Sequence, residues 1–418
     1  MRIHVISMCA ILAIIPLYWL PVLPDLHIVW LLIAAGIALS VQQRKWLRFS
    51  GLALLFMCWG ILAAQESVWP MNHLTKVPQQ AEVVITATDG ATMHQGRIIS
   101  LNGERVWAAM GVALYGNYLP QNVCVGQRWA MTLRLRAVHG ELNDGGYDSQ
   151  KNAFARHQTL SGRFTHAALV DEGCSLRAQY LTSLQSTLSA YQWGPVILGL
   201  GMGERLSVSR EIKNLMRETG TMHLMAISGL HIALAASAVW LLARGIQFFL
   251  PGRWIIWQIP LLAGLIFAAF YAWLTGLQPP ALRTAIALVV LAALKMSGRQ
   301  WSPWQVWLTC VAAILVFDPL AVLSQSLALS AFAVAALIFW YQWLPLPHWQ
   351  RGRCLRPLVT LLYLQVGMLL LLLPLQVLIF HGFSLSSLAA NLFAVPLVTF
   401  ISVPLILLGM FLHLFPVA

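Results

Sequence analysis

The sequence predicts a polytopic α-helical membrane protein of about ten transmembrane helices, with a small β-barrel domain inserted after the third helix. Of the 418 residues, 59% are hydrophobic and only 10% are charged, whereas a soluble domain carries about 25% charged residues. Long apolar runs of about 18 residues recur along the chain, as expected for membrane-crossing helices. One more polar segment interrupts them with alternating apolar residues, which indicates antiparallel strands.

Three spans are expected first, in the N-terminal region 1–64, near residues 5–22, 26–42 and 49–64. The first is interpreted as a membrane helix and not as a signal peptide, because no small-residue cleavage site follows it and further spans do. The loop "QRKWLR" after the second span is basic, whereas the turn "PVLPD" has no Lys or Arg. The positive-inside rule therefore places residues 65–220 outside the cytoplasm.

The region 65–175 is expected to form the barrel. Its runs "AEVVITATDG", "QGRIISLNGERVWAAM", "VGQRWAMTLRLRAV" and "LSGRFTHAALV" alternate in polarity and are separated by Gly, Asn and Asp. About five short strands in roughly 100 residues fit a small barrel such as an OB-fold. Residues 176–221 are then expected to form amphipathic helices on the membrane surface. Seven further spans follow in the region 222–418, near 222–243, 254–274, 280–296, 302–317, 320–343, 358–380 and 386–413.

The net charge of +12 reflects membrane topology more than a ligand. Residues 65–220 contain 14 Lys and Arg against 12 Asp and Glu, a difference of +2. Short loops between spans hold most of the remaining cations: Arg44, Lys45, Arg48, Arg244, Arg253, Lys295, Arg299, Arg351, Arg353 and Arg356. Basic residues in alternate loops follow the positive-inside rule.

Two of the six cysteines, Cys124 and Cys174, lie in the outer region. An oxidising compartment favours a disulfide between them. Enzyme signatures are missing from the sequence: "GLGMGERLS" lacks the Lys of a P-loop, no HExxH occurs, and "AISGL" is not a GxSxG elbow. We therefore predict no catalytic residue, metal ligand or cofactor for this chain.

The stretch "GTMHLMAISGLHIAL" carries polar residues into an apolar span. His223, Ser228 and His231 are candidates for lining a path, and Ser228 and His231 share a helix face. The pattern alone leaves open a helix-packing face, a transport path and, least favoured, a metal site. Arg283 in "GLQPPALRTAIAL" fits an interfacial arginine as well as a pore-facing one. Asn391 in "LAANLFAVPL" fits interhelical packing as well as a path lining.

Several motifs together resemble the ComEC family of bacterial DNA-uptake channels. They are "GERLSVSREIKNLMRETGTMHLMAISGLHIAL", "LTGLQPPALRTAIAL", "FDPLAVLSQSLALSAFAV" and "GFSLSSLAANLFAVPLVTF", in the family's order, and they follow a β-region ending in "LNDGGYDSQKNAFARHQTLSGRF". One departure is Ser326 and Leu327 in "SLALSAF", where the family pattern has Gly and Phe.

The resemblance implies an inner-membrane channel that moves one DNA strand from the periplasm to the cytoplasm during transformation. It also implies a periplasmic OB-like domain held by the Cys124–Cys174 disulfide. Other competence proteins, such as a DNA receptor and a cytoplasmic helicase, are expected partners, and a homo-oligomer is compatible with the sequence. Family members often carry a C-terminal metallo-β-lactamase-like domain, which these 418 residues lack; the chain is expected to be truncated.

A channel for single-stranded DNA needs cations that follow the phosphates and aromatic rings on which bases stack. The candidates in the β-region are Arg105, Trp107, Arg128, Trp129, Arg134 and Arg136. For each tryptophan, a place in the barrel core is an equally good interpretation. Two other classes stay open: a secondary transporter of a small solute, and a membrane enzyme that uses the Ser228/His231 face.

Overall fold

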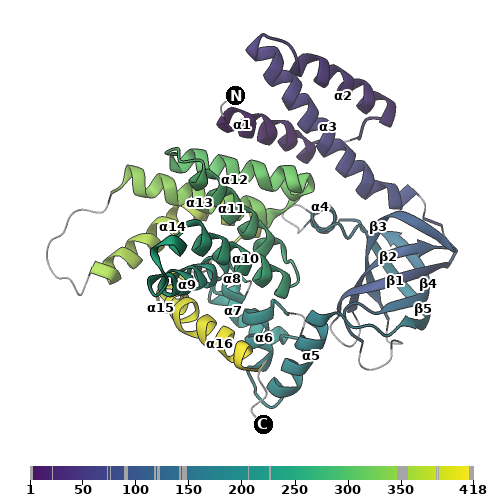
Figure 1. Cartoon of the computed structure of the whole chain (residues 1–418). Helices are drawn as coiled ribbons and strands as arrows, with labels where there is room; N and C mark the ends of the chain where they lie inside the picture. The colour runs from purple at the N-terminus through teal and green to yellow at the C-terminus, as the bar shows by residue number, and fades with distance from the viewer. Residues whose placement is uncertain are drawn as a thin grey trace. The chain divides into compact units, whose positions relative to one another are not determined.

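The computed structural model describes residues 3–413 except 21, 73, 76, 89–92, 117–118, 120–122, 141–142, 144–147, 206, 226, 346–355, 383 and 385, and excludes the side chains of 107–109, 356–358 and 380. The chain divides into two compact units. One comprises Met1–Thr182 and Val311–Leu327, and the other comprises Ser183–Cys310 and Ala328–Ala418. Figure 1 labels the helices and strands of both.

The first unit begins with three apolar helices. They are α1 (Ile3–Ile14), which continues as the 3₁₀ turn η1 (Ile15–Tyr18), α2 (Leu26–Ser40) and α3 (Lys45–Asn72). α2 and α3 form a closely packed pair, because a Cβ atom added at Gly51 would lie 2.5 Å from the backbone nitrogen of Ser40. Small residues allow this approach of two apolar helices. α3 continues eight residues beyond the predicted span, and the first strand begins seven residues later.

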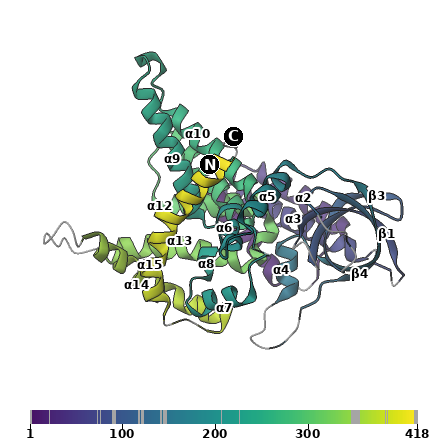
Figure 2. The same ribbon diagram turned by 90° about the horizontal axis from the view of Figure 1, so that it is seen from below.

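The barrel of the first unit contains five strands in the closed order β1-β2-β3-β5-β4, seen as a ring in Figure 2. β3 and β5 pair in parallel, and the other neighbours are antiparallel. This confirms the prediction of a small five-stranded barrel. The strands are β1 (Gln79–Thr88), β2 (Met93–Leu101), β3 (Glu104–Tyr115), β4 (Arg128–Ala137) and β5 (Leu160–Asp171).

Alternation along the strands builds the core of the barrel. In β4, Trp129, Met131, Leu133 and Leu135 are buried, and the residues between them are not. Successive side chains of a strand point to opposite faces, so one face fills the interior. The β2–β3 hairpin turns at the Asn-Gly pair 102–103, where both residues have positive φ (51° and 87°). Asn-Gly favours this tight turn, whose twist matches that of the strands.

A short helix, α4 (Ser149–Ala155), is inserted between β4 and β5. Asp148 caps it, since its Oδ1 accepts a hydrogen bond from the Lys151 backbone nitrogen (3.0 Å). His157 follows with a φ of 54°. The backbone passes close to β3 there, because a Cβ atom at Gly111 would lie 1.9 Å from the His157 carbonyl oxygen. α4 also packs against the 3₁₀ turn η3 (Pro319–Leu323) of the same unit.

The second unit is helical. Its helices, including those that cross the division between the units, are α5 (Leu176–Leu188), α6 (Gly194–Met202), α7 (Arg210–Glu218), α8 (Met222–Met225), α9 (Gly229–Phe248), α10 (Gln258–Leu274), α11 (Pro279–Met296), α12 (Pro303–Phe317), α13 (Gln325–Trp343), α14 (Arg356–Phe380), α15 (Ser387–Leu397), the π-helical turn η4 (Val398–Ser402) and α16 (Val403–His413). α7 carries the charged face expected of a surface helix, whereas α6 is apolar and packs against α16.

Six helical segments within the described residues are long and apolar enough to cross a membrane, and four shorter apolar helices occupy other predicted spans. The chain is therefore a membrane protein with a barrel domain, and the total of about ten spans stays a prediction. One predicted span starts late: α9 begins at Gly229 and not at residue 222, because Ser228 adopts extended backbone angles and caps the helix.

Candidate functional site

In the second unit, the amino-terminal ends of α9 and α11 meet. The Ser228 hydroxyl oxygen caps α9 by accepting a hydrogen bond from the His231 backbone nitrogen (3.3 Å). A Cβ atom added at Gly229 would lie 2.6 Å from Oγ1 of Thr284 in the first turns of α11. Gly229 is thus the residue that lets the two helices touch. The motifs "ISGLH" and "QPPALRT" therefore lie side by side in the fold, although Gly229 and Thr284 are 55 positions apart in the sequence.

Arg283 lies one turn inside α11. Its Nε donates to the Pro279 carbonyl (3.0 Å), and its Nη1 donates to the Ser330 hydroxyl of α13 (3.3 Å). The guanidinium therefore reaches back along the first turn of its own helix. A helix amino terminus carries partial positive charge, so this end of α11 combines a helix dipole with a full cation.

His231 is buried, with 1% of its surface exposed, and its neighbour in the sequence, Ile232, belongs to an apolar cluster formed by α9, α10 and α11. Among the described residues, neither of its ring nitrogens has a hydrogen-bond partner, and neither does the hydroxyl of Tyr271 in the same cluster. The Ser228 hydroxyl is therefore not bonded to the imidazole. A serine nucleophile needs that hydrogen bond to its base, so the geometry gives the Ser228/His231 enzyme hypothesis no support.

A second contact in the same unit joins the end of α7 to the segment before α15. The hydroxyls of Ser384 and Ser386 donate to the Glu218 carbonyl (2.6 and 3.2 Å). A Cβ atom at Gly220 would lie 2.5 Å from Cβ of Ser387. His223 lies beside this contact, where its Nδ1 is 3.0 Å from the Gly220 carbonyl oxygen.

Asn391 lies one turn further along α15, and its buried Oδ1 has no partner among the described residues. The candidates for lining a path therefore divide between two polar places: Ser228, His231 and Arg283 at the α9–α11 ends, and His223 and Asn391 near the α7–α15 contact. No three His, Cys, Asp or Glu side chains come together as a metal site in the part of the chain that the structure describes.

The candidates of the barrel separate into surface and core. Arg105, Arg128, Arg134 and Arg136 are exposed. Trp129 is 2% exposed, and its Nε1 is 3.3 Å from Oε1 of Gln127. Its ring faces are covered by the barrel core, so of its two interpretations the structure favours the core residue over the base platform. The side chain of Trp107 lies outside the described residues.

Two exposed residues that the sequence did not single out lie beside the arginines. Arg163 of β5 pairs directly with Arg134 of β4, and Tyr115 of β3 pairs with Arg163 on its other side. Arg163 lies in the predicted strand "LSGRFTHAALV". Nothing in that run, including the polar pair Thr165 and His166 that follows Arg163, indicates which residues of other strands lie beside it. Only the register of the strands reveals this juxtaposition.

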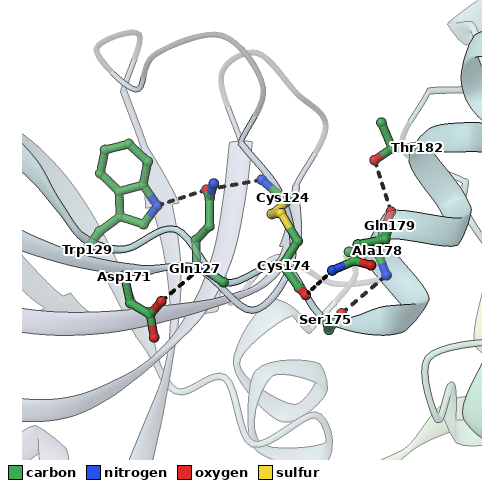
Figure 3. Close-up of a disulfide and its surroundings, with 10 residues drawn as sticks. Cys124, Gln127, Trp129, Asp171, Cys174, Ser175, Ala178, Gln179 and Thr182 are labelled. Carbon is green, nitrogen blue, oxygen red and sulfur yellow. Dashed lines mark hydrogen bonds between the residues drawn. A yellow bond between two sulfur atoms is a disulfide. The ribbon is translucent and has the colours of Figure 1, made fainter.

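The predicted disulfide between Cys124 and Cys174 is present (Figure 3). It joins the segment before β4 to the segment after β5. Ser175 strengthens the connection, because its backbone nitrogen donates to the Val125 carbonyl (2.9 Å) and its hydroxyl caps the start of α5. Gln127 accepts hydrogen bonds from the Cys124 backbone nitrogen (3.2 Å) and from the indole of Trp129. The disulfide and these hydrogen bonds thus connect the barrel core, through Gln127 and Trp129, to the segment that leads from β5 into α5.

An ion pair links the barrel insertion to η3 within the first unit. Nε2 of the half-exposed His157 is 3.2 Å from Oδ1 of Asp318. The hydrogen bond to Asp318 raises the pKa of His157 above its ordinary value, against the opposing effect of burial, and Arg97 of β2 and Glu66 of α3 act on it more weakly in opposite directions. Nearby, the Lys151 ammonium lies 4.4 Å from the ring centre of Tyr18, a cation–π contact.

Replacing His157 with Gln is expected to lower thermal stability more at pH 5.5 than at pH 8.5. Because the folded pKa is raised, the pair contributes its full stability below pH 6.5, the ordinary value, and loses it as the pH rises through the folded pKa. The pair is partly exposed, so the drop at pH 5.5 should be small, about 2 °C. Melting of the purified chain at both pH values checks this, with His139→Gln as a matched exposed histidine. An effect equal at both pH values would contradict it.

Comparison with known proteins identifies the family of the chain. A family model described as "Competence protein" matches residues 200–418, which is 219 of the 418 residues. The chain belongs to the ComEC family of competence proteins. The matched region of this ComEC-family chain contains both polar places described above.

Relatives of this ComEC-family chain extend the similarity to the barrel. The chain is 59% identical to the uncharacterized protein YcaI of Escherichia coli over 99% of its own length and 55% of the relative. It is 33% identical to recombination protein 2 of Haemophilus influenzae over 90% of its length and 47% of the relative. It is 32% identical to competence protein ComA of Neisseria gonorrhoeae over 66% of its length and 41% of the relative. The chain thus spans about half the length of these relatives. No solved structure matches it.

Proposed function

We propose that this chain forms an inner-membrane channel through which one DNA strand passes from the periplasm to the cytoplasm during natural transformation. The observation that carries the proposal is the meeting of the α9 and α11 amino termini at Gly229 and Thr284, with Arg283 beside them. The dipole of a helix gives its amino terminus a partial positive charge that favours anions such as phosphate. The names of the competence and recombination relatives support a role in DNA uptake.

The proposal also assigns a role to the barrel and to partner proteins. The barrel lies in the periplasm, where its disulfide is stable, and receives the strand. The phosphate-facing helix ends then pass it inward. Other competence proteins deliver the strand and draw it into the cytoplasm, since the sequence shows no nucleotide-binding motif. In this proposal the chain itself is not an enzyme.

A transformation assay with Arg283 variants tests the proposal. Deleting the gene should abolish transformation, and the full-length wild-type gene should restore it. Arg283→Gln should lower the frequency about tenfold or more, because a charge-assisted hydrogen bond to an anion contributes about 1.5–3 kcal/mol. Arg283→Lys should retain part of the activity because the charge remains.

The matched control is Arg253→Gln, which removes one cation from an exposed turn of the same unit and should leave transformation unchanged. All variants are compared at equal amounts in the membrane. Normal transformation by the deletion strain would contradict the proposal and favour a transporter of a small solute. A wild-type transformation frequency in the Arg283→Gln variant would show that Arg283 does not contribute to the DNA path.

A further inference from the structure

One outer face of the barrel gathers three arginines and a tyrosine from three neighbouring strands. In β4 and β5 the residues Leu133, Leu135 and Phe164 are buried, while their sequence neighbours point outward. In β3, Leu114 is likewise buried and Tyr115 is 46% exposed. The outward residues form what we call the arginine strip: Tyr115, Arg163, Arg134 and Arg136.

The strand register places the members of the arginine strip side by side. Tyr115 is the partner of Arg163 in the parallel β3–β5 pair, and Arg163 is the partner of Arg134 in the antiparallel β4–β5 pair. Neighbouring strands lie about 4.8 Å apart, so this row crosses three strands within about 10 Å. Arg136 lies two residues along β4 from Arg134, on the same face. Four side chains from distant parts of the sequence thus form one compact surface.

The charges of the arginine strip are not balanced by the described part of the barrel. Like charges directly opposite one another destabilise a sheet. The ion pairs of the described residues, Lys151–Asp148 and His157–Asp318, do not involve the strip. At the other end of β4, by contrast, Arg128 stands opposite Asp171. A folded barrel that keeps Arg134 against Arg163 is suited to an anion that bridges them.

We propose that the arginine strip binds single-stranded DNA, with the arginines on successive phosphates and Tyr115 stacked on a base. This inference rests on the proposed function, which identifies the bound polyanion as single-stranded DNA. It adds the face of the barrel on which that DNA binds. Single-strand sites combine cations that follow the backbone with aromatic stacking platforms, and the strip supplies both. It lies on β3, β5 and β4, whereas OB-folds bind nucleic acid on the face of their second and third strands.

The surroundings of the arginine strip favour a nucleic acid over a membrane surface. Its neighbours Thr132, Thr165 and His166 are polar, and Thr165 and His166 are exposed. The exposed apolar residues of β5, Leu169 and Val170, lie about 20 Å further along the strand at 3.3 Å per residue. A surface that docks on lipid would be expected to place its apolar side chains among its cations.

Binding of a fluorescent oligothymidine to the full chain in detergent, at several salt concentrations, tests the inference. Arg134→Gln with Arg163→Gln should weaken binding at least about tenfold and reduce the salt slope by about 1.4, since each phosphate contact on a single strand contributes about 0.7. Tyr115→Ala should weaken binding about tenfold, and Tyr115→Phe should bind almost as the wild type does. The matched control Arg97→Gln with Arg156→Gln removes the same charge from exposed positions of the same unit, outside the arginine strip, and should have a much smaller effect.

A melting experiment excludes misfolding as the cause. Relief of the Arg134–Arg163 repulsion should leave the midpoint of the double variant equal to or above that of the wild type. Unchanged DNA binding by the double variant, while the wild type binds, would overturn the inference. Lost binding to phosphatidylglycerol vesicles with unchanged DNA binding would overturn it in favour of a lipid surface.

Transformation assays separate this inference from the proposed function. If the deletion abolishes transformation and the double variant binds DNA normally, the inference that the arginine strip binds DNA is wrong and the channel proposal stands. If the deletion strain transforms normally, the channel proposal fails. The oligothymidine titration then still decides whether the strip binds a single strand.

Discussion

Replacing Cys124 and Cys174 with serine is expected to lower the free energy of unfolding of the barrel by about 4 kcal/mol. The disulfide closes a loop with a sequence separation of 50 residues, and the chain-entropy estimate for such a loop is about 4 kcal/mol. The bond connects the two segments that flank the antiparallel β4–β5 pair, so these strands should lose protection first. Hydrogen exchange of their backbone amides should accelerate by up to about a thousandfold.

Reduction of the wild type provides the internal control. Dithiothreitol should accelerate exchange in β4 and β5 of the wild-type chain and have no effect on the double serine variant. Cys9→Ser removes a thiol from α1 that forms no disulfide and should leave the barrel unchanged. Equal exchange rates in the wild type and the double variant would show that the disulfide does not stabilise the barrel.

Replacing Gly229 with valine is expected to separate the amino-terminal ends of α9 and α11 and to abolish most transformation. The first added carbon would lie 2.6 Å from Oγ1 of Thr284, and the branched side chain adds two more. Overpacking of this kind costs about 1–3 kcal/mol. A shift of the two helix ends relative to Arg283 moves the groups that we propose to face phosphate, so a loss of about tenfold or more is expected at 1.4 kcal/mol per factor of ten.

The same helix supplies a matched control. Gly245 also lies in α9, and an added Cβ atom there meets nothing within 4 Å, so Gly245→Val should transform normally. A rescue is also expected. Gly229→Ala adds only the carbon that lies 2.6 Å from the Thr284 hydroxyl and should lower transformation less than Gly229→Val does; Thr284→Ala, which removes that hydroxyl, should recover part of this loss. If Gly245→Val is as defective as Gly229→Val, the effect is one of helix insertion and not of the α9–α11 contact.

Patterns within short segments of the sequence were enough to predict the barrel and most of the helices. The alternation that buries Trp129, Met131, Leu133 and Leu135 is visible in "RWAMTLRLRA", and the Asn-Gly turn marks the β2–β3 hairpin. The start of α9 was misplaced for a local reason as well. Ser228 has extended backbone angles and caps the helix at Gly229, and hydropathy averages over such a single-residue break.

Pairings between distant residues explain what the sequence did not reveal. Tyr115 and Arg163 meet only because β3 and β5 pair in parallel, and nothing in either strand specifies that partner. His157 and Asp318 are 161 residues apart. The motif "AISGLH" was recognisable as a special segment, yet its contact with Thr284 depends on how two helices pack. Side-chain partnership across elements is a property of the tertiary structure, whereas alternation and capping are properties of short segments.

The strand order β1-β2-β3-β5-β4 also constrains how the protein is made. β1 closes the ring by pairing with β4, and β3 closes it by pairing with β5, so the first three strands form a sheet with both edges unpaired. Unpaired edges invite association with other chains. The barrel can therefore close only once the chain has been made as far as residue 171. Closure through such non-local pairs is slow, on the order of milliseconds to seconds, so the barrel folds as one unit and not strand by strand as the chain is made.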